Sequence, residues 1–217
     1  MGLTIHYKLL THRRLTLADV KKITVALHAK AVALEFADVG EPMEVGPDYP
    51  GIYHIPPGCK RTSEVLPPLE GWVFHATPGD GSESVKLGLC RFAGVRGWRL
   101  HGFCKTQYAS HHGWEHFLKC HRGVIELLRQ AEKFGLRVKV EDEGELWKTG
   151  SPARLRRKLE EYDGAVAAFG GALKDALGDK VEGPIFQHPG FEHLEAAGAA
   201  AHGGQVAQAV RLVKRFV

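Results

Sequence analysis

Apolar and polar residues alternate at the start of the chain. The odd-numbered positions from Leu3 to Leu9 are apolar and those between them are polar, which predicts a half-buried β-strand over residues 3–10. Apolar residues then recur at every third or fourth position, which predicts a helix over residues 16–36. A strand over residues 40–45 would complete a β-α-β unit.

The two patterns return after residue 70 and predict the rest of the fold. The expected elements are strands over 71–77, 83–92 and 97–108, a helix over 113–134, a strand over 136–141, and helices over 151–177 and 205–217. This order favours an α+β fold of ferredoxin-like kind, with a mixed, mostly antiparallel sheet and helices packed on one face. We expect a core over residues 1–150 and a helical C-terminal extension over residues 151–217.

Residues 46–70 show neither pattern and hold six of the eleven prolines, so they predict a long irregular loop. Loops of this length are uncommon inside domains and are often lids or binding loops, although a packed structural flap also fits. Apolar residues such as Tyr53 and Ile55 would anchor this loop.

Composition and charge restrict the function only weakly. The formal net charge of +4 is too small to indicate a nucleic-acid binder. No apolar run is long enough to cross a bilayer, and the first residues do not look like a signal peptide, so we expect a cytoplasmic protein without a membrane partner. None of the four cysteines forms a Cys-x-x-Cys pair, and Cys90 and Cys104 fall in predicted strands as small core residues.

The densest group of possible metal ligands is His112, His116 and Cys120, which recur every four residues. Residues at this spacing share a face of a helix, provided that the helix begins by His112. A divalent transition metal such as zinc would fit these donors, with a further ligand from His75 or His101. The alternative is that the histidines lie in a loop and that Cys120 is simply buried.

A second candidate is an anion site where the 97–108 strand meets the following helix. A helix N-terminus offers free backbone amides to an anion. Lys105, Gln107 and Tyr108 would face it together with His111 and His112, and His6 would join them from a neighbouring strand. The expected partner is a small-molecule anion.

Carboxylates cluster between Glu141 and Glu145, where like charges could raise the pKa of one group. Glu143 and His111 are therefore the candidate catalytic residues for proton transfer, and an enzyme of hydrolase type is the first functional hypothesis. A solvated turn is the alternative interpretation of the acidic cluster. Phosphate-loop, dinucleotide-binding and nucleophile-elbow motifs are absent from the sequence.

The rival hypothesis is a non-catalytic interaction module. The predicted C-terminal helix carries an apolar stripe that needs a surface to cover, which the same domain or a second copy in a homo-oligomer could supply. Its residues are Val206, Val210, Val213 and Val217. A basic cluster near residue 155 could contact nucleic acid, or it could be a solvated face with salt bridges. Its members are Arg154, Arg156, Arg157 and Lys158.

Overall fold

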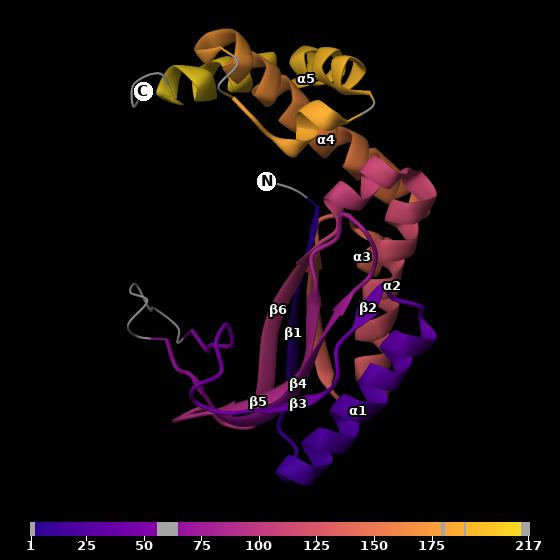
Figure 1. Cartoon of the computed structure of the whole chain (residues 1–217), viewed down its shortest axis with the longest axis vertical. Helices are drawn as coiled ribbons and strands as arrows, with labels where there is room; N and C mark the ends of the chain where they lie inside the picture. Colours follow the sequence, from indigo (N-terminus) through magenta and orange to yellow (C-terminus); the bar gives the residue numbers. More distant parts are fainter. Residues whose placement is uncertain (1–2, 56–64, 179–180, 189, 214–217) are drawn as a thin grey trace. The chain divides into compact units, whose positions relative to one another are not determined.

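The computed structural model describes residues 3–55, 65–178, 181–188 and 190–213 of the chain (Figure 1). In chain order the elements are β1 (Thr4–Thr11), α1 (Leu17–Ala33), β2 (Asp38–Val39), β3 (Met43–Val45), β4 (Pro68–Thr77), β5 (Val85–Phe92), β6 (Trp98–Lys105), the 3₁₀ helix η2 (Gln107–His112), α2 (Trp114–Lys133), β7 (Arg137–Asp142), α3 (Leu146–Thr149), α4 (Pro152–Leu177), η3 (Pro184–Gln187) and α5 (Phe191–Val213).

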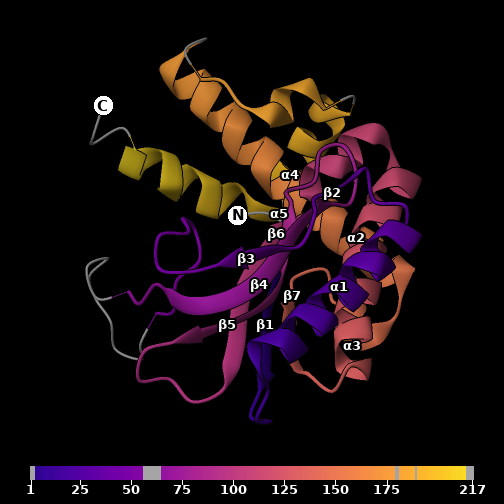
Figure 2. The same ribbon diagram turned by 60° about the horizontal axis from the view of Figure 1, so that its bottom comes forward.

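The strands form one seven-stranded sheet in the order β2-β4-β5-β6-β1-β7, and β3 also pairs with β4. Every strand pairing within the described residues is antiparallel. Helices α1 and α2 cover the same face of this sheet (Figures 1 and 2). The prediction of an α+β fold with a mostly antiparallel sheet and helices on one face is confirmed.

The alternation along β1 places its apolar residues under these helices. Ile5 and Leu9 are fully buried and Tyr7 is 2% exposed, whereas His6 and Lys8 between them are exposed. Helix α1 begins after Thr16, whose side chain accepts a hydrogen bond from the Asp19 amide while the Asp19 carboxylate accepts one from the Thr16 amide.

Three predicted elements differ from the structure. The strand expected over residues 97–108 ends at Lys105, and the 3₁₀ helix η2 follows it from Gln107. The strand expected over residues 40–45 is divided into the short strands β2 and β3. The last helix begins at Phe191, much earlier than residue 205. Residues 191–204 contain glycines that weaken the helical signal, but they pack against α4, and this packing stabilises a helix of low intrinsic propensity.

Two compact units make up the chain, one over Thr4–Asp142 and a second that joins the residues before Thr4 to those from Glu143 onward. The first holds the sheet with α1 and α2. In the second, α4 and α5 pack along each other, and Val210 in the predicted apolar stripe is 8% exposed. Val217 lies outside the described residues. No helix in the described part of the chain is long and apolar enough to cross a membrane.

The described parts of the proline-rich loop lie against the sheet face opposite to α1 and α2, and the loop ends where β4 begins at Pro68. Its two described parts meet where His54 and Leu66 exchange backbone hydrogen bonds of 2.9 Å in both directions. Residues 56–64, and Cys59 with them, lie outside the described residues. The other three cysteines are free thiols and buried, so the prediction for Cys90 and Cys104 is confirmed.

Candidate ligand-binding site

Side chains on the face away from the helices line up in rows across β6, β1 and β7. Lys8 on β1 is the register partner of both His101 on β6 and Lys139 on β7. The next row has His6 at its centre, between Phe103 and Glu141. We call this surface the open face.

Positive charge is concentrated on the open face. Its lysine and arginine residues are Lys8, Arg99, Lys105, Arg137 and Lys139, and its one carboxylate is Glu141. The excess of four positive charges equals the formal net charge of +4 of the whole chain. The remaining residues of the chain therefore carry equal numbers of positive and negative charges. The small net charge of the chain is thus compatible with a strongly cationic open face.

Like charges that lie directly opposite each other on neighbouring strands destabilise a sheet. Lys8 and Lys139 form such a pair, and His101 adds a third group that can carry positive charge to the same row. The row contains no carboxylate. An anion placed over it would relieve the repulsion.

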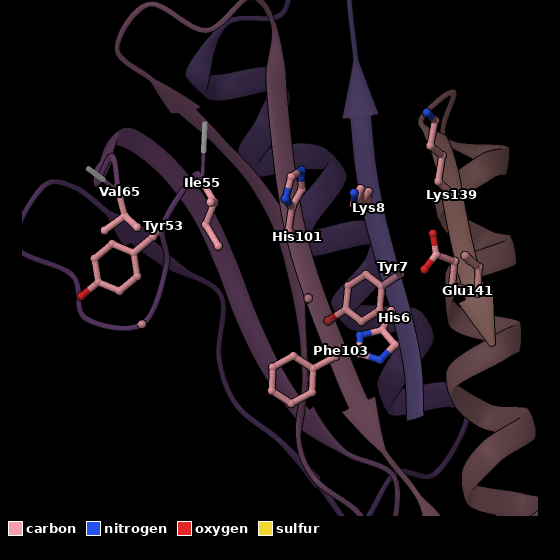
Figure 3. A pocket seen from close by; sticks show the side chains of 13 residues that line it. His6, Tyr7, Lys8, Tyr53, Ile55, Val65, His101, Phe103, Lys139 and Glu141 are labelled. Atoms are coloured by element: carbon pink, nitrogen blue, oxygen red, sulfur yellow. The ribbon is translucent and has the colours of Figure 1, made fainter. Parts of the chain in front are cut away.

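The rows form the floor of a pocket of about 580 Å³, a size typical of small-molecule sites. Loop residues Tyr53, Ile55 and Val65 face His101 and Phe103 across it (Figure 3). Tyr53, Ile55 and Phe103 expose 48%, 60% and 57% of their surface, so the pocket has an apolar wall that is open to solvent. The other lining residues are His6, Tyr7, Lys8, Gly51, Gly102, Lys139, Val140 and Glu141.

Three contacts attach the loop to the sheet beside this pocket. The Lys86 ammonium donates a 2.9 Å hydrogen bond to the carbonyl oxygen of Gly51, and the Tyr49 hydroxyl lies 2.9 Å from Nε2 of His75. The His54 ring packs against the ring of His101, with centroids 5.8 Å apart. The apolar wall is thus held in place by side chains of β4, β5 and β6.

His101 and His54 favour the neutral form. Burial lowers the pKa of His101, and the neighbouring cations Lys8 and Arg99 lower it further. Burial also lowers the pKa of His54, with a smaller contribution from Arg99. At neutral pH the positive charge beside these two rings therefore comes from lysine and arginine, and the two imidazoles act as neutral hydrogen-bonding groups.

Below the open face, Tyr7 fills a gap between β5 and β6. Its hydroxyl donates a 2.6 Å hydrogen bond to the Lys86 carbonyl oxygen and accepts a 3.0 Å bond from the Lys86 amide. The ring crosses β6 at Gly102, where a Cβ atom would collide with it. The buried Tyr7 hydroxyl thus takes the place of a backbone partner for Lys86 and holds the strands under the pocket together.

The predicted metal ligands do not share one helical stripe. Helix α2 begins at Trp114 and His112 ends the preceding 3₁₀ helix, so the condition for a shared stripe, a helix that begins by His112, is not met. Gly113 separates the two elements with a φ of 95°, a conformation that glycine adopts easily. The His112 and His116 rings still lie close, with centroids 5.2 Å apart.

His116 and Cys120 are neighbours on α2, with Nε2 and Sγ 3.6 Å apart. However, His116 Nε2 also lies 2.9 Å from the Asp80 carbonyl oxygen, to which it donates, and burial raises the pKa of the Cys120 thiol. The described residues contain no group of three or more histidine, cysteine or acidic side chains arranged to hold a metal ion. His75 and His101 contact the loop residues Tyr49 and His54, on the sheet face opposite to α2. The structure therefore gives the zinc site no support.

Only part of the predicted anion site comes together. The Lys105 ammonium lies 3.3 Å from the Tyr108 hydroxyl and 4.5 Å from the centre of its ring, and His111 packs against the same ring. Gln107 is 1% exposed. His6 lines the open-face pocket, whose described lining includes none of the other five residues.

The carboxylates of the acidic cluster lie at different places and have different partners. Glu141 lies at the open face, whereas Glu145 pairs with Arg154 at 2.8 Å. Glu143 belongs to the second unit and His111 to the first, so their action as a catalytic pair stays a prediction.

Sequence patterns did not reveal a buried relay formed by Thr106, His121 and Asp142. His121 Nε2 lies 3.0 Å from the Asp142 carboxylate, and its Nδ1 lies 2.8 Å from the Thr106 hydroxyl. This hydroxyl–imidazole–carboxylate order is that of a hydrolytic triad. Thr106 and His121 have no exposed surface, however, so the relay ties β6, α2 and β7 together and has no access to a substrate.

Most of the pocket residues were likewise missed. Of those on the floor, His6 is a candidate for the anion site, whereas His101 and Glu141 are candidates only as a metal ligand and as a member of the acidic cluster. Lys8 and Lys139, which carry the positive charge, are not among the candidates. The available signal was the polar side of the alternation in three strands. These polar side chains form a site only because the register places the three strands side by side.

Comparisons with protein-family models, with curated proteins and with solved structures find no match to this chain.

Proposed function

We propose that this protein binds a small organic anion with a planar apolar part in the open-face pocket. The observation that carries the proposal is the row Lys139–Lys8–His101, in which two lysines are direct register partners and neither forms an ion pair with a carboxylate of the described residues. The lysines would bind the anionic group as point charges. The planar part would contact Phe103 and Tyr53.

The expected ligand follows from the lining. A phosphate or carboxylate would sit over the cationic row, and a ring would rest against exposed aromatic surface. Nothing in this recognition requires a metal. Hydrolysis remains a prediction, as does assembly through α5.

The finer fold assignment belongs to the same proposal. Strands β7, β1, β6 and β5 lie side by side, α1 follows β1, and α2 connects β6 to β7. We propose that these elements form a ferredoxin-like core, extended at one edge by β4, β2 and β3.

Calorimetric titration with phenyl phosphate at pH 7.5 tests the binding proposal, with benzyl alcohol as the uncharged comparison. We expect phenyl phosphate to bind and benzyl alcohol to bind at least tenfold more weakly. Lys8→Gln should weaken phenyl phosphate binding by about tenfold, equivalent to about 1.4 kcal/mol. The matched control is Lys22→Gln, an exposed lysine on α1, which should bind as the wild type does.

Absence of phenyl phosphate binding by a folded wild-type protein would overturn the proposal. Equal losses in the two lysine variants would also contradict it, because they would indicate a response to net charge alone. Circular dichroism spectra of all variants show whether the fold is retained.

A further inference from the structure

We infer that the physiological ligand of the open face is single-stranded nucleic acid, which binds with phosphates along the cationic rows and a base on the ring row. This inference rests on the proposed function, because it takes the organic anion to be a nucleotide unit within a longer strand. The surface that carries it is larger than the pocket.

The cationic surface continues past the pocket in both directions. In the row beyond Lys8, Arg99 and Arg137 flank Leu10, and at the other end Lys105 is the partner of Thr4. Among the described residues, Nε of Arg99 has no hydrogen-bond acceptor although it is buried. A small molecule would leave these outer charges without a counterpart, whereas a polyanion that runs along the strands would meet them in turn.

The distance between the aromatic rings and the lysines on the open face suits a nucleotide, with its base on a ring and its phosphate at a lysine. The ring row of His6 and Phe103 is two residues from the row of Lys8, which corresponds to about 7 Å along an antiparallel strand. The two rings lie on neighbouring central strands with centroids 6.1 Å apart, and Phe103 exposes 57% of its surface. A base stacked on Phe103 would place its phosphate near Lys8 and Lys139.

The same features favour a single strand over a duplex. Exposed aromatic rings on a sheet recognise bases whose faces are free, and stacked base pairs in a duplex hide those faces. A cationic groove beside such rings is the usual combination for single strands. The carboxylate of Glu141 in the ring row could accept a hydrogen bond from an amino group on a base.

The basic cluster of α4, by contrast, is partly neutralised within its own unit. Arg154 pairs with Glu145, and Lys158 pairs with Glu161, both at 2.8 Å. Arg157 on the same helix is exposed and lies outside the open face. It therefore serves as the control for loss of one positive charge elsewhere.

Fluorescence anisotropy with labelled single strands of about eight nucleotides, as RNA and as DNA, tests the inference at about 50 mM salt. A duplex of the same length and vesicles that contain phosphatidylserine serve as competitors. We expect either single strand to bind and neither competitor to displace it efficiently. Phe103→Leu should weaken binding at least fivefold while Phe103→Trp preserves it, since tryptophan keeps a stacking surface that leucine lacks.

The salt dependence of the binding affinity shows which positive side chains contact phosphates of the strand. Each phosphate contact on a single strand contributes about 0.7 to the slope of log affinity against log salt concentration. Lys8→Gln should therefore reduce the slope by about that amount, and Arg157→Gln should leave it unchanged. A larger effect of Arg157→Gln than of Lys8→Gln would overturn the inference.

Failure of this inference is distinguishable from failure of the proposed function. Binding of phenyl phosphate without binding of any octamer would overturn the nucleic-acid inference and leave the small-anion pocket standing. Preferential binding of phosphatidylserine vesicles would overturn it in favour of a membrane surface. If the folded protein binds neither phenyl phosphate nor the octamers, both the proposed function and the nucleic-acid inference are overturned.

Discussion

Tyr7 connects the core of the first unit with its candidate site. The ring lies in the buried layer and the hydroxyl satisfies both backbone groups of Lys86 on β5, two strands away from its own strand. The side chain of Lys86 in turn holds Gly51 of the loop. One buried phenol thus supports a loop that forms the apolar wall of the pocket.

Tyr7→Phe should destabilise the protein by about 2 kcal/mol. The substitution leaves the buried amide and carbonyl of Lys86 without their partner, and each unsatisfied buried group costs about 1–3 kcal/mol. Urea denaturation measures the change. Tyr53→Phe, which removes a hydroxyl from an exposed tyrosine, is the control and should change stability by less than about 0.5 kcal/mol. Equal stability of the two variants would contradict the role assigned to Tyr7.

Glu141 is the one carboxylate in the rows and opposes an anionic ligand. Glu141→Gln removes this repulsion with little change in shape, so phenyl phosphate should bind about threefold more tightly, as expected for one exposed charge interaction of about 0.6 kcal/mol. Calorimetric titration measures the gain, and Glu126→Gln on α2 provides the charge-matched control. Weaker binding by the Glu141 variant would show that the carboxylate contacts the ligand directly.

At the scale of elements, the sequence predicts most helices and strands but not their partners. Helix α4 begins after Ser151 with Pro152 in its first turn, as expected from capping chemistry, and α2 ends within two residues of its predicted end. Helix α5 was predicted too short because Gly198, Gly203 and Gly204 weaken its signal. Gly198 belongs to a close approach of α5 to α4, which only tertiary structure reveals.

Two glycine substitutions in α5 should therefore have opposite effects. A Cβ at Gly198 would collide with the backbone of Gly164 on α4, so Gly198→Ala should destabilise the helix pair by about 1–3 kcal/mol. A Cβ at Gly204 meets nothing within 4 Å, so Gly204→Ala should stabilise the helix by about 0.5–1 kcal/mol. Thermal unfolding followed by circular dichroism distinguishes them. Equal shifts in the two melting temperatures would contradict the close packing at Gly198.

At the scale of the whole molecule, the candidate site depends on which strands become neighbours. Lys8, His101 and Lys139 are separated by 93 and 38 positions in the sequence, yet the register makes one row of them. A local pattern predicts that each is on the polar side of a strand and says nothing of the pairing. The His116 and Cys120 pair was predictable because it lies within one helix, where spacing alone determines proximity.

Three histidines, His54, His75 and His101, should make global stability depend on pH. Burial lowers the pKa values of His54, His75 and His101 below the ordinary value of 6.5, so the unfolded chain binds protons that the folded chain resists. Stability from this source is fully present above about pH 7 and is lost as pH falls through 6.5 toward the lowered values. The free energy of unfolding from urea denaturation should therefore decrease between pH 7.5 and about 5.5. In His54→Gln the decrease should be shallower, because glutamine cannot take up the proton. A constant free energy of unfolding over this interval, or an identical slope in the variant, would show that these imidazoles are not protected from protonation by the fold.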